Sequence, residues 1–240
     1  MTFQQKRPDL NLRIFNDLTS GVSMRKSAIN HRCSYLTIYR KFLWLAQIAK
    51  SHHEQQSLGA IKELQFDEME SLEHTKLKPL TIALAVSDDY RILGVQVGTI
   101  PAKGALSALA QQKYGYRENQ SSQKILELLT SLKTKELSHT VLLKSDAKIT
   151  YRELVKKVFP KNPYEQYVCR GQKEKRREMK HQSQEKKIFD PLFALNQRCA
   201  KLRDHIKRLT RRSWCTSKLK EHLEAHLYLY IAYNNKYQLI

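Results

Sequence analysis

Residues 80–86 read LTIALAV, a nearly continuous apolar run. An apolar run of about four to eight residues is typical of a strand buried inside a sheet. Residues 63–69 (ELQFDEM) and 91–98 (RILGVQVG) predict a strand on either side of it, and Asp88 and Asp89 predict a turn. We therefore expect three consecutive strands that pair as an antiparallel sheet.

Downstream of these strands, helical and strand patterns alternate. Helices are expected at 105–114, 122–133 and 150–159, and strands at 139–146 and 164–170. Three antiparallel strands followed by parallel strands with helical crossovers is the order of the ribonuclease-H-like fold. Other α/β folds share parts of this order, so it does not define the fold alone. We expect residues 64–240 to form such an α/β domain, a mixed five-stranded sheet with flanking helices, a basic insertion at 171–188 and C-terminal helices.

The charge of the chain indicates the class of its partner. The 240 residues include 43 Lys and Arg against 23 Asp and Glu, a formal net charge of +20. Residues 170–220 hold 17 Lys and Arg against 5 Asp and Glu, so over half of the excess charge lies there. Such a field favours polyanions, and DNA is the expected partner because phosphate neutralisation releases counterions. A ribosomal or otherwise merely soluble basic protein is the alternative.

The sequence also indicates where the protein works. It contains no apolar run of the roughly 18 residues that a membrane span needs, and its N-terminus lacks a signal-peptide core. The four cysteines form no CxxC pair, so they indicate neither a disulfide framework nor a zinc site. We expect reduced core thiols in a cytoplasmic, nucleoid-associated protein with no membrane partner.

Residues 1–52 are expected to form a three-helix helix-turn-helix module, and residues 53–63 a polar linker. Ser23 and Ser34 suit the N-caps of the second and third helices. The third helix, 35–50, is basic, and the recognition helix of such a module presents its N-terminal side chains to base edges in the major groove. A plain three-helix bundle with a solvated basic surface is the alternative. The candidate DNA contacts are Arg25, Tyr35, Thr37, Arg40 and Lys41.

The C-terminal region predicts two further helices. The first begins at Asp190 and Pro191, a cap followed by a first-turn proline, and the second spans 218–235. The expected apolar stripes are Leu195, Cys199, Leu202, Ile206 and Leu209 in the first helix, and Leu219, Leu223, Leu227 and Tyr230 or Ile231 in the second. Basic side chains cover the rest of the first helix and continue beyond it. Those expected to contact DNA are Arg198, Lys201, Arg203, Arg208, Arg211 and Arg212.

Two aspartates occupy strand positions that suit metal-dependent chemistry on DNA. Asp67 lies inside the first strand and Asp146 ends the fourth. Phosphoryl transfer on DNA commonly uses two divalent ions about 4 Å apart, and Mg²⁺ or Mn²⁺ prefers hard oxygen ligands. Both aspartates lie beside apolar residues, where a carboxylate without a cation is costly; ordinary strand-end or turn aspartates are the alternative. Glu68 and Glu70 are near Asp67, but strand alternation places Glu68 on the opposite face.

A third oxygen ligand is expected from a helix further along the chain. The basic helix has no glutamate between Asp190 and Thr210. Asn196, in its first two turns, offers an amide oxygen, which binds a metal less strongly than a carboxylate does. Asp190, Asp204 and Glu185 are its rivals, although Asp190 also suits the role of helix cap.

Five stretches of the sequence resemble one known family. Residues 195–218 (LNQRCAKLRDHIKRLTRRSWCTSK) resemble the signature helix of insertion-sequence transposases of the insertion element one type and their relatives. FDEME (66–70) resembles the first catalytic block of that family, and LLKSDAKITYRELV (142–155) the second. GVSMRKSA (21–28) and TIYRKFLWLA (37–46) resemble its helix-turn-helix. The resemblance covers nearly the whole chain, and the C-terminal stretch is its most specific part.

The resemblance implies DDE-type chemistry, in which metal-activated water cuts the element's ends and the freed 3′ hydroxyl attacks target DNA. It places Asp67 and Asp146 at the two aspartate positions, and Asn196 where many members have glutamate. Some related groups use asparagine there, and a decayed site is the other interpretation. The implied cofactors are two Mg²⁺ or Mn²⁺ ions. The implied partners are DNA, as terminal inverted repeats and target, and further copies of the chain on that DNA.

Three alternatives remain open from the sequence. The chain could be a catalytically inactive or truncated transposase remnant that acts only as a DNA-binding protein. It could also be a structure-specific nuclease of the same fold. Many relatives carry a zinc ribbon before the helix-turn-helix, and the N-terminus of this chain resembles the segment just after such a ribbon, so an upstream ribbon or a truncated element would explain the start.

Overall fold

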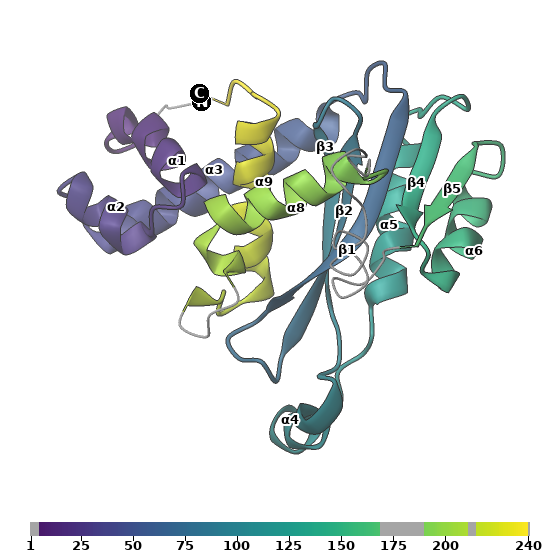
Figure 1. Ribbon diagram of the computed structural model, residues 1–240. Coiled ribbons are helices and arrows are strands. Elements are labelled where there is room, and N and C mark those ends of the chain that lie inside the picture. Colours follow the sequence, from purple (N-terminus) through teal and green to yellow (C-terminus); the bar gives the residue numbers. More distant parts are fainter. Residues whose placement is uncertain (1–4, 169–189, 211–214, 240) are drawn as a thin grey trace, which may run out of the picture.

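The computed structural model describes residues 5–168, 190–210 and 215–239. The chain has an α/β structure built on a mixed five-stranded sheet, as the sequence predicts (Figure 1). The strands are β1 Glu63–Leu72, β2 Pro79–Ser87, β3 Ile92–Thr99, β4 Leu142–Asp146 and β5 Tyr164–Tyr167. Within the described ranges, no helix combines the length and apolar composition needed to cross a membrane.

The order of the strands brings distant parts of the sequence together. The sheet runs β3-β2-β1-β4-β5, with β1 antiparallel to β2, β2 antiparallel to β3, and β4 parallel to both β1 and β5. Gln65 of β1 is the last residue of that strand paired with β4, and its partner is Lys144. Asp67 and Asp146 each lie two residues beyond that pair. Because β1 and β4 run in the same direction, the two aspartates leave the paired region at the same end.

Helices cover both faces of the sheet (Figure 1). One face packs on α5 Ser121–Lys133 and α6 Ile149–Val158, where Leu64 and Phe66 of β1 are fully buried. The other face packs on α8 Phe193–His205 and α9 Lys220–Asn234, and Met69 of β1 lies in that core. Odd-numbered residues of β1 therefore face α8, and even-numbered residues face α5.

The N-terminal helices form a third layer outside α9 (Figure 1). They are η1 Pro8–Leu10, α1 Asn11–Thr19, α2 Met24–Asn30 and α3 Tyr35–Gln55. Ser23 and Ser34 cap α2 and α3 as predicted, because their hydroxyls accept from Lys26 N at 3.2 Å and Thr37 N at 3.1 Å. The core of this layer includes Leu229 of α9, so the N-terminal helices share a core with the C-terminal helix. Helix α3 also continues through the first residues of the stretch expected as a linker.

The C-terminal region differs from its prediction in three details. The basic helix ends at His205, because Ile206 is extended (φ −101°, ψ 100°), and a 3₁₀ turn, η3 Lys207–Leu209, follows. Ile206 and Leu209 are nevertheless buried, so the apolar stripe is right and the continuous helix is wrong. Leu219 precedes α9 and is 50% exposed, so it is not part of the stripe of α9.

Candidate active site

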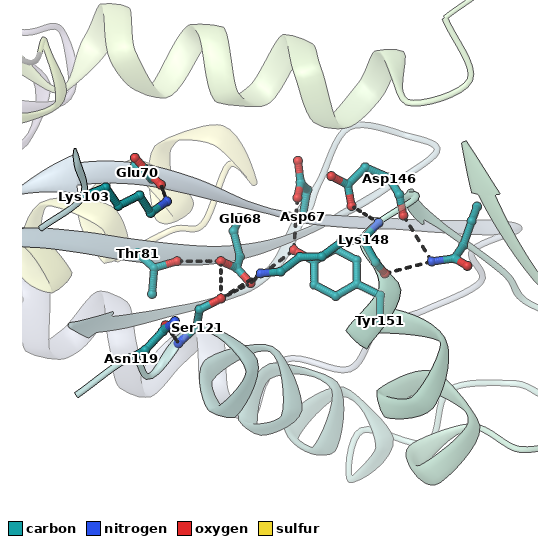
Figure 2. Close-up of polar contacts among 11 residues, drawn as sticks. Asp67, Glu68, Glu70, Thr81, Lys103, Asn119, Ser121, Asp146, Lys148 and Tyr151 are labelled. Atoms are coloured by element: carbon teal, nitrogen blue, oxygen red, sulfur yellow. Dashed lines mark hydrogen bonds and ion pairs between the residues drawn. The ribbon is translucent and has the colours of Figure 1, made fainter. Parts of the chain in front are cut away.

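A cleft of about 390 Å³ opens where β1 and β4 separate. Its walls carry four carboxylates and two lysines, with a buried tyrosine at the base (Figure 2). These residues are Asp67, Glu68, Glu70, Asp146, Lys103, Lys148 and Tyr151. The sequence predicted the two aspartates from their strand positions, and the structure brings both into the same cleft.

Asp67 is a partly buried carboxylate with little compensation for its charge. The Tyr151 hydroxyl donates to its Oδ1 at 3.1 Å, the only side-chain hydrogen bond to Asp67 among the described residues. Burial raises the pKa of Asp67 to about 6, and the neighbouring charge of Asp146 adds to the rise. The Glu68 backbone N–H and the Tyr151 hydroxyl oppose the shift without cancelling it. Asp67 and Asp146 are therefore close enough to repel each other.

Asp146 is positioned by the turn that follows β4. Its Oδ1 accepts from the backbone N–H of Lys148 at 3.2 Å, and its carbonyl accepts from Ser145 Oγ at 2.7 Å. An aspartate that binds the backbone two residues ahead is a common way to fix a turn. Figure 2 shows the carboxylates of Asp67 and Asp146 on the side of β1 that α8 covers.

Glu68 lies on the other side of β1, as strand alternation predicts. Its carboxylate accepts from Lys148 Nζ at 2.8 Å, Thr81 Oγ1 at 3.1 Å and Ser121 Oγ at 2.7 Å. Burial would raise the pKa of Glu68, but the hydrogen bonds from Lys148 and Ser121 outweigh it and hold the pKa below its usual value. Glu68 is therefore an ionised and fully compensated group, whereas its neighbour Asp67 is not.

Tyr151 connects these two environments. Its side chain is fully buried, and its hydroxyl is 3.2 Å from Glu68 Oε1 as well as 3.1 Å from Asp67 Oδ1. Burial and the carboxylates around it raise the pKa of Tyr151 far above its usual range, so the phenol keeps its proton and acts as a donor.

The donor set of the aspartate pair fits a divalent cation. Two carboxylates from adjacent parallel strands offer the hard oxygen ligands that Mg²⁺ and Mn²⁺ prefer. A cation between them would offset the cost of burying the Asp67 charge, which is the main cause of its raised pKa, and would also relieve the added repulsion from Asp146. Within the described parts of the chain, however, His, Cys, Asp and Glu side chains form no cluster of three or more that could hold a metal. The pair thus supplies two ligand side chains of the three that were expected.

Asn196 lies outside the cleft. It is exposed on α8, and its Nδ2 donates to Asp190 Oδ2 at 2.8 Å. Cys199 of α8 is close enough to Asp67 for its pKa to be affected. Burial raises the pKa of Cys199 to about 11, the charge of Arg203 opposes this rise, and the charge of Asp67 adds to it. The structure thus does not bring Asn196 to the aspartate pair.

Of the three rivals for the third ligand, the two that lie in the described residues are not part of the cleft. Asp190 Oδ1 accepts from the backbone N–H of Leu192 at 3.0 Å, but α8 begins at Phe193 with Leu192 as its N-cap, so Asp190 is not the helix cap that the sequence suggested. Asp204 is exposed on α8 and does not line the cleft. Glu185 lies outside the described residues, as does the basic insertion 171–188.

The expected DNA contacts of the N-terminal helices divide into exposed and occupied side chains. Arg25, Tyr35 and Arg40 are exposed, while Thr37 is half-buried beside its cap. Lys41 was expected on the DNA-facing surface, and this is wrong. It is buried, and its Nζ donates to Asn11 Oδ1 at 2.6 Å, because position 41 shares the inner face of α3 with Ile38 and Leu45.

The basic side chains of α8 and the following turn are also partly occupied. Lys201 is exposed, but the Arg198 guanidinium lies over the Tyr90 ring at 5.2 Å, and Arg203 is half-buried. Arg208 Nη1 donates to the carbonyl of Thr216 at 3.1 Å and so holds the chain before α9. Arg211 and Arg212 lie outside the described residues.

Sequence reasoning missed several residues of the site. Tyr151 shares the apolar stripe of α6 with Val155 and Val158, so its sequence position suggested only a core residue. Gln65 is buried beneath α8, where its Oε1 accepts from Leu195 N at 3.0 Å and its Nε2 donates to Pro191 O at 3.3 Å. Its only sequence signal was a polar residue at an inward position of a strand. No local pattern marks Ser121, because its contact with Glu68 depends on tertiary structure.

Comparison with known proteins adds no relative. The sequence matches no protein-family model and no curated protein. The features of this chain that bear on its function are therefore the geometry of the cleft, the charge of the chain and the sequence resemblance described above.

Proposed function

We propose that this chain is an insertion-sequence transposase that binds the terminal inverted repeats of its element and catalyses metal-dependent DNA strand cleavage and strand transfer. The observation that carries the proposal is the pairing of Asp67 and Asp146. They come from parallel strands 79 residues apart and share one cleft, where burial raises the pKa of Asp67 to about 6 and the charge of Asp146 adds to the rise. The strand order β3-β2-β1-β4-β5 and its directions support a ribonuclease-H-like domain.

In this proposal, each residue of the cleft has a definite task. Asp67 and Asp146 would hold Mg²⁺ or Mn²⁺, which would supply the positive charge needed to activate water and to stabilise the leaving oxygen of the cut strand. Lys148 pairs with Glu68 and Lys103 with Glu70, so of the four carboxylates in the cleft Asp67 and Asp146 are the two without an ion pair among the described residues. The backbone N–H of Lys148 fixes the orientation of Asp146.

The N-terminal helices supply the proposed DNA-binding half. Helices α2 and α3 are joined by a short turn, and α3 begins with the exposed side chain of Tyr35, followed by the exposed Arg40 on its second turn. Arg25 is exposed on α2, in a position to contact phosphate. Together with a net charge of +20, this arrangement supports a helix-turn-helix module that presents α3 to the major groove. A homo-oligomer in the nucleoid, paired on two element ends, completes the proposal.

One observation favours a second function, a DNA-binding remnant without catalysis. The position expected to supply the third ligand, Asn196, is bonded to Asp190 and is not part of the cleft. A protein of this kind would bind the element's ends and occupy them without cutting.

Cleavage assays with point variants separate the two functions. The purified full chain is incubated with Mg²⁺ or Mn²⁺ and DNA that carries the inverted repeats flanking its own gene. We expect cut or joined products from the wild type and none from Asp67→Ala or Asp146→Ala, with DNA affinity retained in both. Glu153→Ala, an exposed acidic position on α6, is the matched control. Binding without products in the wild type would establish the remnant, and equal activity in all variants would reject the site.

A further inference from the structure

The contacts of Tyr151 assign it a further role at the site. Its one hydroxyl proton faces two carboxylates, Asp67 Oδ1 at 3.1 Å and Glu68 Oε1 at 3.2 Å (Figure 2). Glu68 already accepts hydrogen bonds from Lys148 and Ser121. Asp67 accepts from no other side chain in the described part of the chain. The hydroxyl therefore contributes most at Asp67.

Tyr151 is held in place independently of Asp67. Its side chain is fully buried, and its ring centroid lies 5.3 Å from that of Phe66, the β1 residue next to Asp67. Lys148 Nζ lies 5.2 Å from the ring centroid and is itself bonded to Glu68. Because core side chains are close-packed, the hydroxyl occupies a fixed point at the base of the cleft.

We propose that Tyr151 is a positioning residue for Asp67, which holds Oδ1 in place so that the carboxylate presents its other oxygen to a divalent cation shared with Asp146. This inference rests on the proposed function, because that function supplies the cation. Groups that hydrogen-bond to a metal ligand restrict its orientation, and their loss typically weakens metal affinity by about 10- to 100-fold. Tyr151 acts through Asp67 and does not itself contact the ion.

The variant Tyr151→Phe tests the role without changing charge. It keeps the ring and its contact with Phe66 and removes only the hydroxyl. The matched control is Tyr237→Phe, which removes a hydroxyl bonded to His53 Nδ1 at 2.9 Å from a residue that does not line the cleft. Mn²⁺ affinity of the full chain is measured by calorimetry. The rise in unfolding temperature that Mn²⁺ causes is measured in parallel, since it reports binding even in a destabilised variant.

The possible results separate the two proposals. We expect Tyr151→Phe to bind Mn²⁺ about tenfold more weakly than the wild type, and Tyr237→Phe to bind it equally well. Rates of strand cleavage should fall in Tyr151→Phe at sub-saturating Mn²⁺ while DNA affinity stays unchanged. Equal Mn²⁺ affinity in the wild type and Tyr151→Phe would overturn the positioning role and leave the transposase proposal standing. If the wild type binds Mn²⁺ no better than Asp67→Ala, both the metal site and the role of Tyr151 are overturned.

Discussion

Replacing Asp67 with asparagine tests whether the aspartate pair is strained without a cation. Asparagine has nearly the same shape, and its amide oxygen can still accept the Tyr151 hydroxyl that lies 3.1 Å from Oδ1. The substitution removes the charge that burial and Asp146 disfavour. We therefore expect Asp67→Asn to stabilise the metal-free protein at neutral pH, although most substitutions at partly buried positions destabilise.

The magnitude follows from the pKa of Asp67, which is about 6 against an ordinary value of 3.8. A difference of one pH unit corresponds to about 1.36 kcal/mol, so the ionised carboxylate costs at most about 3 kcal/mol of folding free energy, and about 2 kcal/mol after solvent screening. The folded protein holds this proton more tightly than the unfolded chain, so the penalty is complete above pH 6 and disappears as pH falls below about 4. For a chain of this size, 2 kcal/mol corresponds to about 4–8 °C in unfolding temperature.

Calorimetric or circular-dichroism melts measure this effect. Wild type, Asp67→Asn and the exposed control Glu153→Gln are compared in EDTA at pH 7.5 and pH 4, where the difference should appear and vanish respectively. Saturating Mg²⁺ should stabilise the wild type and not Asp67→Asn, which would reverse the order at pH 7.5. A lower unfolding temperature for Asp67→Asn than for wild type in EDTA at pH 7.5 would show that the Asp67 charge does not destabilise the metal-free protein.

Three further predictions test other parts of the structure. Gln65→Leu removes both hydrogen bonds to the start of α8 and should lower the free energy of unfolding by about 2–3 kcal/mol in urea titrations; a loss under about 0.5 kcal/mol would contradict the anchoring of α8 by this side chain. Burial, then the charge of Lys135, lower the pKa of His53 to about 4. As pH falls from about 6.5 to 4, His53 is therefore protonated in the unfolded chain but not in the folded protein, which lowers the stability of the wild type. His53→Gln lacks this loss, so over that range its free energy of unfolding should fall by up to about 3 kcal/mol less than that of the wild type. Arg40→Ala should weaken DNA binding and reduce the slope of log affinity against log salt by about one, whereas Lys41→Met should leave the slope unchanged because Lys41 is buried.

The strands and the aspartate pair could be predicted because short-range patterns determine them. The run at 80–86 is apolar apart from Thr81 and is buried on both faces in β2. Asp67 and Asp146 interrupt apolar strand patterns, and parallel pairing of β1 with β4 then places them at one end of the sheet. Alternation along β1 also separated Asp67 from Glu68 correctly.

The position of Asn196 outside the cleft could not be predicted from sequence because it depends on how α8 is rotated over the sheet. Asn196 follows Leu195, the stripe residue whose backbone N–H binds Gln65, so its own side chain turns toward solvent. That rotation is fixed by a tertiary hydrogen bond between residues 130 positions apart in the chain. No pattern within the helix contains this information.

Helix α9 shows a second limit of single-stripe reasoning. Leu223, Leu227 and Ile231 pack on the sheet as predicted, but Leu229 and Ala232 face the N-terminal helices. The stretch is apolar on more than one side, which is typical of a helix buried between two layers. Because only one apolar face of the helix was considered, its contact with the N-terminal helices was not predicted.

This shared core has a consequence for biosynthesis. The ribosome releases α1, α2 and α3 well before α9. The core that Phe42 and Leu45 share with Leu229 stays incomplete until α9 has followed. Domains generally fold as they emerge, N-terminal part first, but here the first layer needs the last helix. The N-terminal layer therefore reaches its final packing only when translation has passed α9, so a nascent chain that has not yet released α9 presents it incompletely folded.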